Sequence, residues 1–189
     1  DAQPFDTSGK SRVDWKDSTI RKWLNDDFYN SAFSEKEKEN IVESKSEGFE
    51  EYNTSMNLTG GGKPYAYLER EIEDKVFLLS NTELCAYFSE DPYPGCYSDP
   101  YAHKELLCYP TAYAKQQLET RYQTETCGWW LCNHVYEDDS VELVSAYGQG
   151  SGTSRENIKA NTKSIAVRPA MWVTWQSDME MVEANQQVE

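Results

Sequence analysis

Five cysteines are the residues of this sequence best suited to covalent or metal chemistry: Cys85, Cys96, Cys108, Cys127 and Cys132. Because five is an odd number, at least one thiol stays free or pairs outside the chain. Two interpretations remain open: buried or idle thiols in a reducing compartment, or one or two disulfides. The favoured disulfide joins Cys108 to Cys127 or to Cys132.

A reactive cysteine pair and a zinc site are the two further roles open to Cys127 and Cys132. A reactive cysteine needs a depressed pKa, and this segment offers neither a positive charge nor a helix start apart from His134. Zinc would take Cys127, Cys132 and His134, with Cys108 as a fourth ligand, but the close Cys-x-x-Cys spacing typical of zinc sites is missing. Structural or disulfide roles are therefore preferred to catalysis and to metal binding.

Aromatic and acidic residues in loops are the candidates for ligand binding. Tyrosine rings in loops can stack on ligands, and five residues form the candidate surface: Tyr93, Tyr97, Tyr101, His134 and Tyr136. The run Glu137-Asp138-Asp139 offers hard oxygen ligands to calcium, although a solvated acidic loop is the preferred interpretation. We expect no other cofactor. The sequence has no Gly-x-Ser-x-Gly motif for a nucleophilic serine.

The composition excludes several kinds of partner. A net charge of −15 argues against nucleic acid, which needs a clustered basic face, and against anionic membrane surfaces. No apolar run approaches the roughly 20 residues that a membrane-spanning helix requires. An extracellular location stays open, because a secreted protein loses its signal peptide on maturation.

Capping signals and apolar periodicity predict the helices that would position these residues. Asp17 or Ser18 begins a first helix with an apolar face. Ser34 and Glu37 form a capping box that opens a second helix through Val42, and Ser80 and Glu83 form another that opens a helix through Phe88. A further helix begins at 110–114.

Apolar runs at 75–79, 128–132, 140–147 and 164–175 predict strands, separated by long irregular loops. Trp129, Trp130 and Trp172 are expected in the core, as is Trp23 on the first helix. Arg168 lies between apolar neighbours, so we expect it to be partly buried and paired with a carboxylate.

Six stretches of the chain resemble, in the right order, a bacterial family of domains of unknown function. They are 15–25, 28–34, 74–80, 110–115, Trp129-Trp130-Leu131 and Val167-Arg168-Pro169-Ala170-Met171-Trp172. The resemblance implies an α+β fold that is C-type-lectin-like and related to sulfatase-modifying factors, with a small twisted antiparallel sheet, two or more helices and long irregular loops. It implies an extended lead-in over 1–14, one domain over 15–176 and an acidic tail over 177–189.

The chain departs from the family pattern at two places. Cys132 stands where the family usually has an arginine. The family also has a strand upstream of the stretch matched by residues 1–5, and that strand normally pairs with the C-terminal one. We therefore expect a domain that lacks its first strands and has an open sheet edge beside 167–173: either the chain is a fragment, or another polypeptide supplies the missing strand.

These observations together predict a non-enzymatic binding or assembly module, extracellular or on a bacterial surface, with a protein or glycan as its ligand. The calcium-binding triplets of carbohydrate-binding C-type lectins, Glu-Pro-Asn, Gln-Pro-Asp and Trp-Asn-Asp, do not occur. The alternatives are a structural subunit completed by another chain and a degenerate enzyme of the sulfatase-modifying kind.

Overall fold

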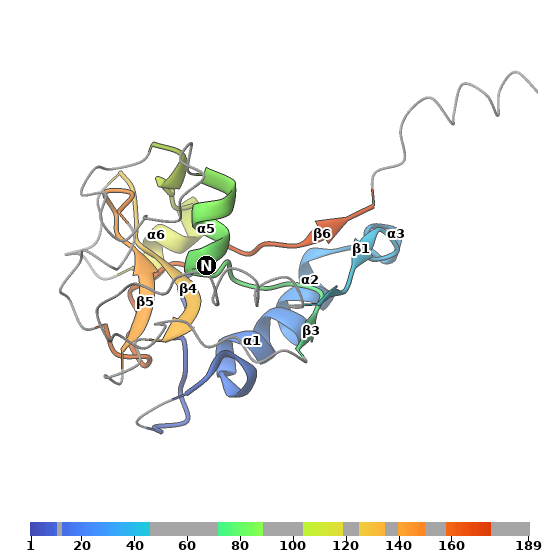
Figure 1. Cartoon of the computed structure of the whole chain (residues 1–189), viewed down its shortest axis with the longest axis horizontal. Helices are drawn as coiled ribbons and strands as arrows, with labels where there is room; N and C mark the ends of the chain where they lie inside the picture. Colours follow the sequence, from blue (N-terminus) through green and yellow to red (C-terminus); the bar gives the residue numbers. More distant parts are fainter. Residues whose placement is uncertain are drawn as a thin grey trace, which may run out of the picture.

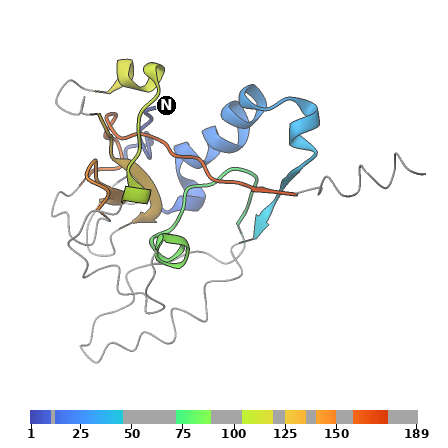
Figure 2. The ribbon, with the colours of Figure 1, turned by 90° about the horizontal axis from the view of Figure 1, so that it is seen from above.

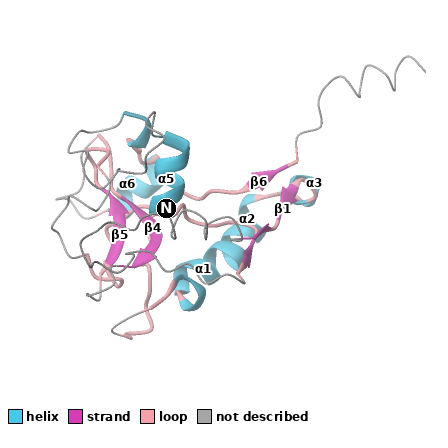
Figure 3. Cartoon of the chain, in the orientation of Figure 1, coloured by secondary structure: helices cyan, strands magenta, loops and turns pink. Residues whose placement is uncertain are grey.

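The computed structural model describes residues 1–10, 13–45, 72–88, 104–118, 125–134, 140–149 and 158–174, and it shows a small α+β fold. The helical elements are η1 (Trp15–Asp17), α1 (Thr19–Trp23), η2 (Leu24–Phe28), α2 (Tyr29–Ala32), α3 (Glu35–Lys38), α5 (Asn81–Phe88), η4 (Lys104–Leu106) and α6 (Ala112–Gln117). The strands are β1 (Ile41–Val42), β2 (Ser44–Lys45), β3 (Glu73–Asp74), β4 (Trp129–His134), β5 (Val141–Val144) and β6 (Trp172–Val173). Short elements are joined by long loops (Figure 3).

The N-terminal helical segment begins where the capping signal predicted. Ser18 is the N-cap of α1, and its Oγ accepts a hydrogen bond from the backbone N–H of Arg21 at 3.3 Å. The segment continues through η2, a π-helical turn, into α2. Its apolar face buries Ile20 and Leu24, while Trp23 and Phe28 pack half-buried against the same core.

The helix that opens at the Ser34 capping box is shorter than predicted. Both hydrogen bonds of the box are present, but α3 ends at Lys38. Ile41 and Val42 form β1 instead and pair antiparallel with β6, so the prediction of a helix through Val42 was wrong. Residues that are β-branched fit a pleated strand well, and here a partner strand is available.

The strands β4 and β5 lie side by side and form an antiparallel pair, with α5 and α6 above them and α1 and α2 at the lower right in Figure 1. Alternate residues of β4 face opposite sides, as the period of a strand requires. One side contributes Trp130 and Cys132 to a core with the N-terminal helices. The other contributes Trp129 and Leu131 to a core that includes Leu84 of α5.

The capping box in the middle of the chain forms as predicted, and the helix predicted to begin at 110–114 begins at Ala112. Ser80 and Glu83 exchange hydrogen bonds at the start of α5, from Ser80 N–H to Glu83 Oε2 at 2.6 Å and from Glu83 N–H to Ser80 Oγ at 3.1 Å. Thr111 caps α6 by accepting from the N–H of Ala114 at 3.2 Å. The predicted strand at 75–79 did not form: β3 ends at Asp74, and within 75–79 only Phe77 makes a bridge, with Ala170.

The C-terminal segment 165–174 crosses the molecule from β4 to β1 (Figure 2). Ala166 pairs with Trp129 on one side and with Ala2 on the other, and the N–H of Val167 donates to the carbonyl of Asp1 at 2.8 Å. Further along, Ala170 pairs with Phe77, and β6 pairs with β1. The edge that we expected to be open beside 167–173 therefore has partners within the chain.

Candidate functional site

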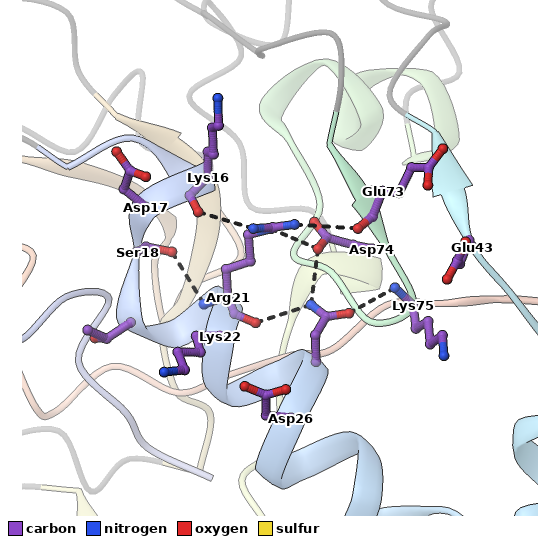
Figure 4. A pocket seen from close by; sticks show the side chains of 12 residues that line it. Lys16, Asp17, Ser18, Arg21, Lys22, Asp26, Glu43, Glu73, Asp74 and Lys75 are labelled. Atoms are coloured by element: carbon purple, nitrogen blue, oxygen red, sulfur yellow. Dashed lines mark hydrogen bonds and ion pairs between the residues drawn. The ribbon is translucent and has the colours of Figure 1, made fainter.

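Asp74, the second residue of β3, forms the centre of a polar cluster between β3 and the N-terminal helical segment. It is only 4% exposed and accepts three hydrogen bonds. The donors are Trp15 Nε1 at 2.9 Å, Arg21 Nε at 2.8 Å and Asn25 Nδ2 at 3.1 Å. Figure 4 shows Arg21 beside Asp74. Burial raises the pKa of the Asp74 carboxyl, and the Trp15 hydrogen bond and the Arg21 charge oppose that shift. The carboxylate is thus fully engaged and holds a helix to a strand.

Asn25 takes the place of a neighbouring strand for the residues that follow Asp74. Its Oδ1 accepts from the N–H groups of Lys75 at 2.8 Å and Val76 at 3.2 Å, and its Nδ2 donates to the carbonyl of Val76 at 2.9 Å. Because a side-chain amide can satisfy these buried backbone groups, this stretch needs no β-ladder. Asn25 lies in the π-helical turn η2, a distortion that is frequent at functional sites.

A polar cleft of about 550 Å³ lies over this cluster. Its cationic lining side chains are Lys16, Arg21, Lys22 and Lys75, and its acidic ones are Asp17, Asp26, Glu43, Glu73 and Asp74 (Figure 4). Four positive and five negative groups nearly balance, although the whole chain has a net charge of −15. The cleft therefore offers donors and acceptors of both signs without a strong field of one sign.

Arg21 sets the shape of one wall of the cleft. Its Nη1 donates to the carbonyl of Lys16 at 3.1 Å and its Nη2 to the carbonyl of Glu73 at 3.4 Å. A guanidinium held at three points by its planar fork is a rigid group. The wall is therefore preorganised, whereas Lys22 and Asp26 on the same helical segment are exposed and free to adapt.

A second cluster of reactive side chains lies at the other core of the molecule. Cys108 and Cys127 stand opposite each other in an antiparallel bridge, and the Cys127 N–H donates to the Cys108 carbonyl at 2.8 Å. Cys132 faces the opposite side of β4, deep in the core with the N-terminal helices. Burial raises the pKa of the Cys132 thiol well above its ordinary value. Cys127 and Cys132 therefore cannot act together, and Cys108 is the partner of Cys127.

The sequence was compared with models of known protein families. Residues 1–175 match the model of a family described as Domain of unknown function (DUF6273). The chain belongs to this family. No curated protein and no solved structure matched the chain in the other comparisons.

Many of the binding residues predicted for this DUF6273 domain lie outside the described residues: Tyr93, Tyr97, Tyr101, Tyr136 and the acidic run 137–139. His134 is the last residue of β4 and pairs with Val141. Among the residues that the structure does describe, no group of three or more His, Cys, Asp or Glu side chains is placed to hold a metal ion. Within the same ranges, no helix is long and apolar enough to cross a membrane.

The structural residues of this DUF6273 domain fall into two groups. Trp129 and Trp130 are fully buried and Trp23 is half-buried. Trp172 was expected in the core, but it is 49% exposed, because β6 pairs with β1 away from the core. Among the described residues, the aromatic ring that it contacts is that of Tyr87.

Arg168 also differs from its prediction. The structure shows no carboxylate partner for it among the described residues; its guanidinium lies 4.9 Å from the centre of the Trp129 ring. Such a cation–π contact stabilises a charge without neutralising it.

Sequence reasoning missed the cluster at Asp74. The one signal was an acidic residue immediately before an apolar run, Asp74 before 75–79. That signal is common, and it names no partner. Trp15, Arg21 and Asn25 lie about 50 to 60 positions earlier in the chain.

Proposed function

We propose that this protein is a non-enzymatic binding module whose ligand occupies the polar cleft over Asp74. The observation that supports this function is the preorganised wall of the cleft, in which a buried carboxylate with three donors holds Arg21 and Asn25 in place. A site whose supporting side chains are fully hydrogen-bonded loses little entropy when a ligand binds. The described lining contains no cysteine or histidine.

The ligand class that suits this cleft is a neutral oligosaccharide. Hydroxyl groups act as donors and acceptors alike, and the lining supplies ammonium, guanidinium, amide and carboxylate groups side by side. An acidic polymer would be repelled by five carboxylates and by the strongly negative chain. A cationic peptide would meet four positive side chains among those carboxylates, so the nearly balanced lining favours a neutral ligand over a charged peptide.

The C-type-lectin-like architecture and a bacterial, extracellular or cell-surface location belong to this proposal. Residue 2 pairs with residue 166, so residues at the start of this chain lie against the C-terminal segment, where the family resemblance implies a strand from further upstream. This pairing also counts against a structural subunit that receives a strand at the same edge. An experimentally determined structure would test the architecture, and localisation of the native protein would test the compartment.

The binding test compares two neighbouring acidic residues on one helical segment. Asp26 lines the cleft, whereas Asp27 is equally exposed and does not. Amide chemical shifts of the full chain are recorded with neutral tetrasaccharides of glucose, mannose and N-acetylglucosamine, and with a Lys/Glu peptide. We expect one of the sugars to shift residues 16–26 and 73–75, and Asp26→Lys to weaken its binding at least about fivefold, the loss of roughly one hydrogen bond.

The matched variant Asp27→Lys changes the net charge by the same amount and should leave the affinity within about twofold. Equal effects of the two variants would show a general charge effect and contradict a site in the cleft. If the peptide shifted the cleft residues and none of the sugars did, the ligand would be a protein and the sugar proposal would be contradicted. No shift at these residues with any of the four probes would remove the cleft from consideration.

A further inference from the structure

Cys108 and Cys127 lie close enough for a disulfide to form between them with a small local adjustment of the two bridged segments. They are directly opposite in an antiparallel bridge, where the backbone hydrogen bond joins the two residues themselves. In such a pair the Cα atoms are about 5.5 Å apart and the side chains share a face. Disulfides have Cα separations of about 5.5–6 Å in most cases, so the pair has a suitable separation. In the structure both thiols are reduced.

The two thiols differ in access and in acidity. Cys108 is half-buried, whereas Cys127 is 1% exposed, and the Cys127 Sγ lies 3.5 Å from the Cys108 carbonyl oxygen. A hydrogen bond from the Cys127 thiol lowers the pKa of Cys108 to about 7, with the Arg168 charge acting in the same direction. The pKa of Cys127 is raised by that same pairing and by burial. Cys108 is therefore the more accessible and more acidic thiol, suited to attack an external disulfide, and Cys127 is suited to react with Cys108 afterwards.

Arg168 brings a positive charge near this pair, and that charge favours the Cys108 thiolate. Its Nη1 atom is buried and has no hydrogen-bond partner among the described residues. Its guanidinium rests on the Trp129 ring, and Trp129 and Cys127 belong to the same core. A buried donor with no acceptor is costly, and a thiolate is an acceptor that would relieve that cost. The same guanidinium whose charge favours the Cys108 thiolate therefore has a donor, Nη1, that is unused within the described part of the chain.

We propose that Cys108 and Cys127 form a thiol–disulfide exchange site, in which Cys108 reacts with a small external disulfide and Cys127 resolves the product. The Cys108 thiolate attacks one sulfur of the external disulfide, forms a mixed disulfide and expels one thiolate, which takes a proton from water. Cys127 then loses its proton to water and attacks the Cys108 sulfur, expelling the second thiolate. The two protein thiols lose two electrons, and the external disulfide is reduced to two thiols.

This inference concerns a different core from the cleft over Asp74 and does not depend on the proposed function. Cys127 belongs to the core that contains Leu84, whereas Trp15 beside Asp74 belongs to the other. Failure of sugar binding would leave the exchange reaction untouched, and the reverse also holds.

The test treats the reduced full chain with oxidised glutathione and maps every cysteine by mass spectrometry of unreduced peptides. In the native sequence we expect a disulfide between Cys108 and Cys127. Cys127→Ser should stop the reaction at a glutathione adduct on Cys108, whereas Cys108→Ser should leave Cys127 unmodified because it is buried. Absence of the Cys108–Cys127 disulfide, or an adduct on Cys127 in Cys108→Ser at the rate seen for Cys108, would overturn the proposal.

The rate of adduct formation in Cys127→Ser provides a second readout that a purely structural role would not change. At pH 7 we expect Arg168→Met to slow it roughly threefold or more, and Arg168→Lys to restore part of the rate. The charged groups that act on the pair are Arg168, Lys115 and the amino group of Asp1. A rate unchanged in a folded Arg168→Met variant would refute the role of Arg168. If that variant does not fold, the two serine variants still decide the proposal.

Discussion

Replacing Asp74 by alanine should destabilise the fold more than the loss of any exposed carboxylate. The substitution removes the acceptor for Trp15 Nε1, Arg21 Nε and Asn25 Nδ2. When one partner of a buried hydrogen bond is removed, the remaining donor has neither water nor a protein acceptor. The free energy lost is then larger than the net contribution of the hydrogen bond itself. The expected loss can therefore be assembled donor by donor.

The three donors are affected unequally. Trp15 is buried, and an unsatisfied donor there costs about 1–3 kcal/mol. The side chain of Arg21 is 26% exposed and keeps two other acceptors, so its loss is nearer 1 kcal/mol, by the same principle. Asn25 Nδ2 still donates to two carbonyls and loses little. The sum is about 3 kcal/mol, at the lower end of the roughly 3–5 kcal/mol for breaking a buried ion pair.

The assay is equilibrium unfolding in urea, followed by tryptophan fluorescence, for the native chain, Asp74→Ala, Asp74→Asn and the control Asp27→Ala. The asparagine side chain of the Asp74→Asn variant would keep one carbonyl oxygen as an acceptor. The stability lost in Asp74→Asn should therefore lie between the losses for Asp27→Ala and Asp74→Ala. Asp27 is exposed on the same helical segment, and its removal should change the free energy of unfolding by less than about 0.5 kcal/mol. If Asp74→Ala lost as little stability as Asp27→Ala, the summed cost of about 3 kcal/mol would be refuted. The cluster at Asp74 would then contribute no more to stability than an exposed side chain does.

Two further predictions concern burial. Burial raises the pKa of Glu83, so the native state favours its protonated form; this contribution is present at acidic pH and is lost as the pH rises above the ordinary carboxyl range. Glu83→Gln keeps the capping acceptor without the charge, so its stability relative to the native chain should rise between about pH 4 and pH 7, measured by urea unfolding at each pH. A difference that stays constant with pH would contradict this. Trp130→Phe should cost about 2 kcal/mol, because the fully buried Trp130 ring donates to the Gln3 carbonyl at 2.8 Å. Trp172→Phe should cost under about 0.5 kcal/mol, because the Trp172 ring is half-exposed. Equal losses of stability in thermal unfolding would contradict the placing of Trp130 in the core and Trp172 at the surface.

Local signals in the sequence located the helix starts well. Ser34 with Glu37, and Ser80 with Glu83, are pairs three residues apart whose hydrogen bonds form within one turn. Such a pair needs no distant partner, so its chemistry can be predicted from spacing alone. The end of α3 could not be predicted in this way, because Ile41 and Val42 become a strand only where β6 is present to pair with them.

The candidate site depended still more on distant contacts. Nothing in the spacing of Asp74 relates it to Arg21 or Asn25, since the two helical residues and the strand are brought together only by packing of α1 and η2 on 72–76. The sequence left open whether Cys108 would pair with Cys127 or with Cys132. The alternation of β4 places Cys132 on the other face, so the structure brings Cys108 beside Cys127, with both thiols free.

The sequence by itself determined that the protein is a small α+β fold with capped helices, a Trp-Trp strand in its core and a strongly acidic surface, because these properties follow from local hydrogen bonds, from periodicity and from composition. The tertiary structure alone decided which side chains meet: Trp172 leaves the core, Arg168 rests on a ring instead of a carboxylate, and two cysteines face each other while a third is hidden. A contact between residues far apart in the chain is set by how the elements pack, and packing depends on all of them at once.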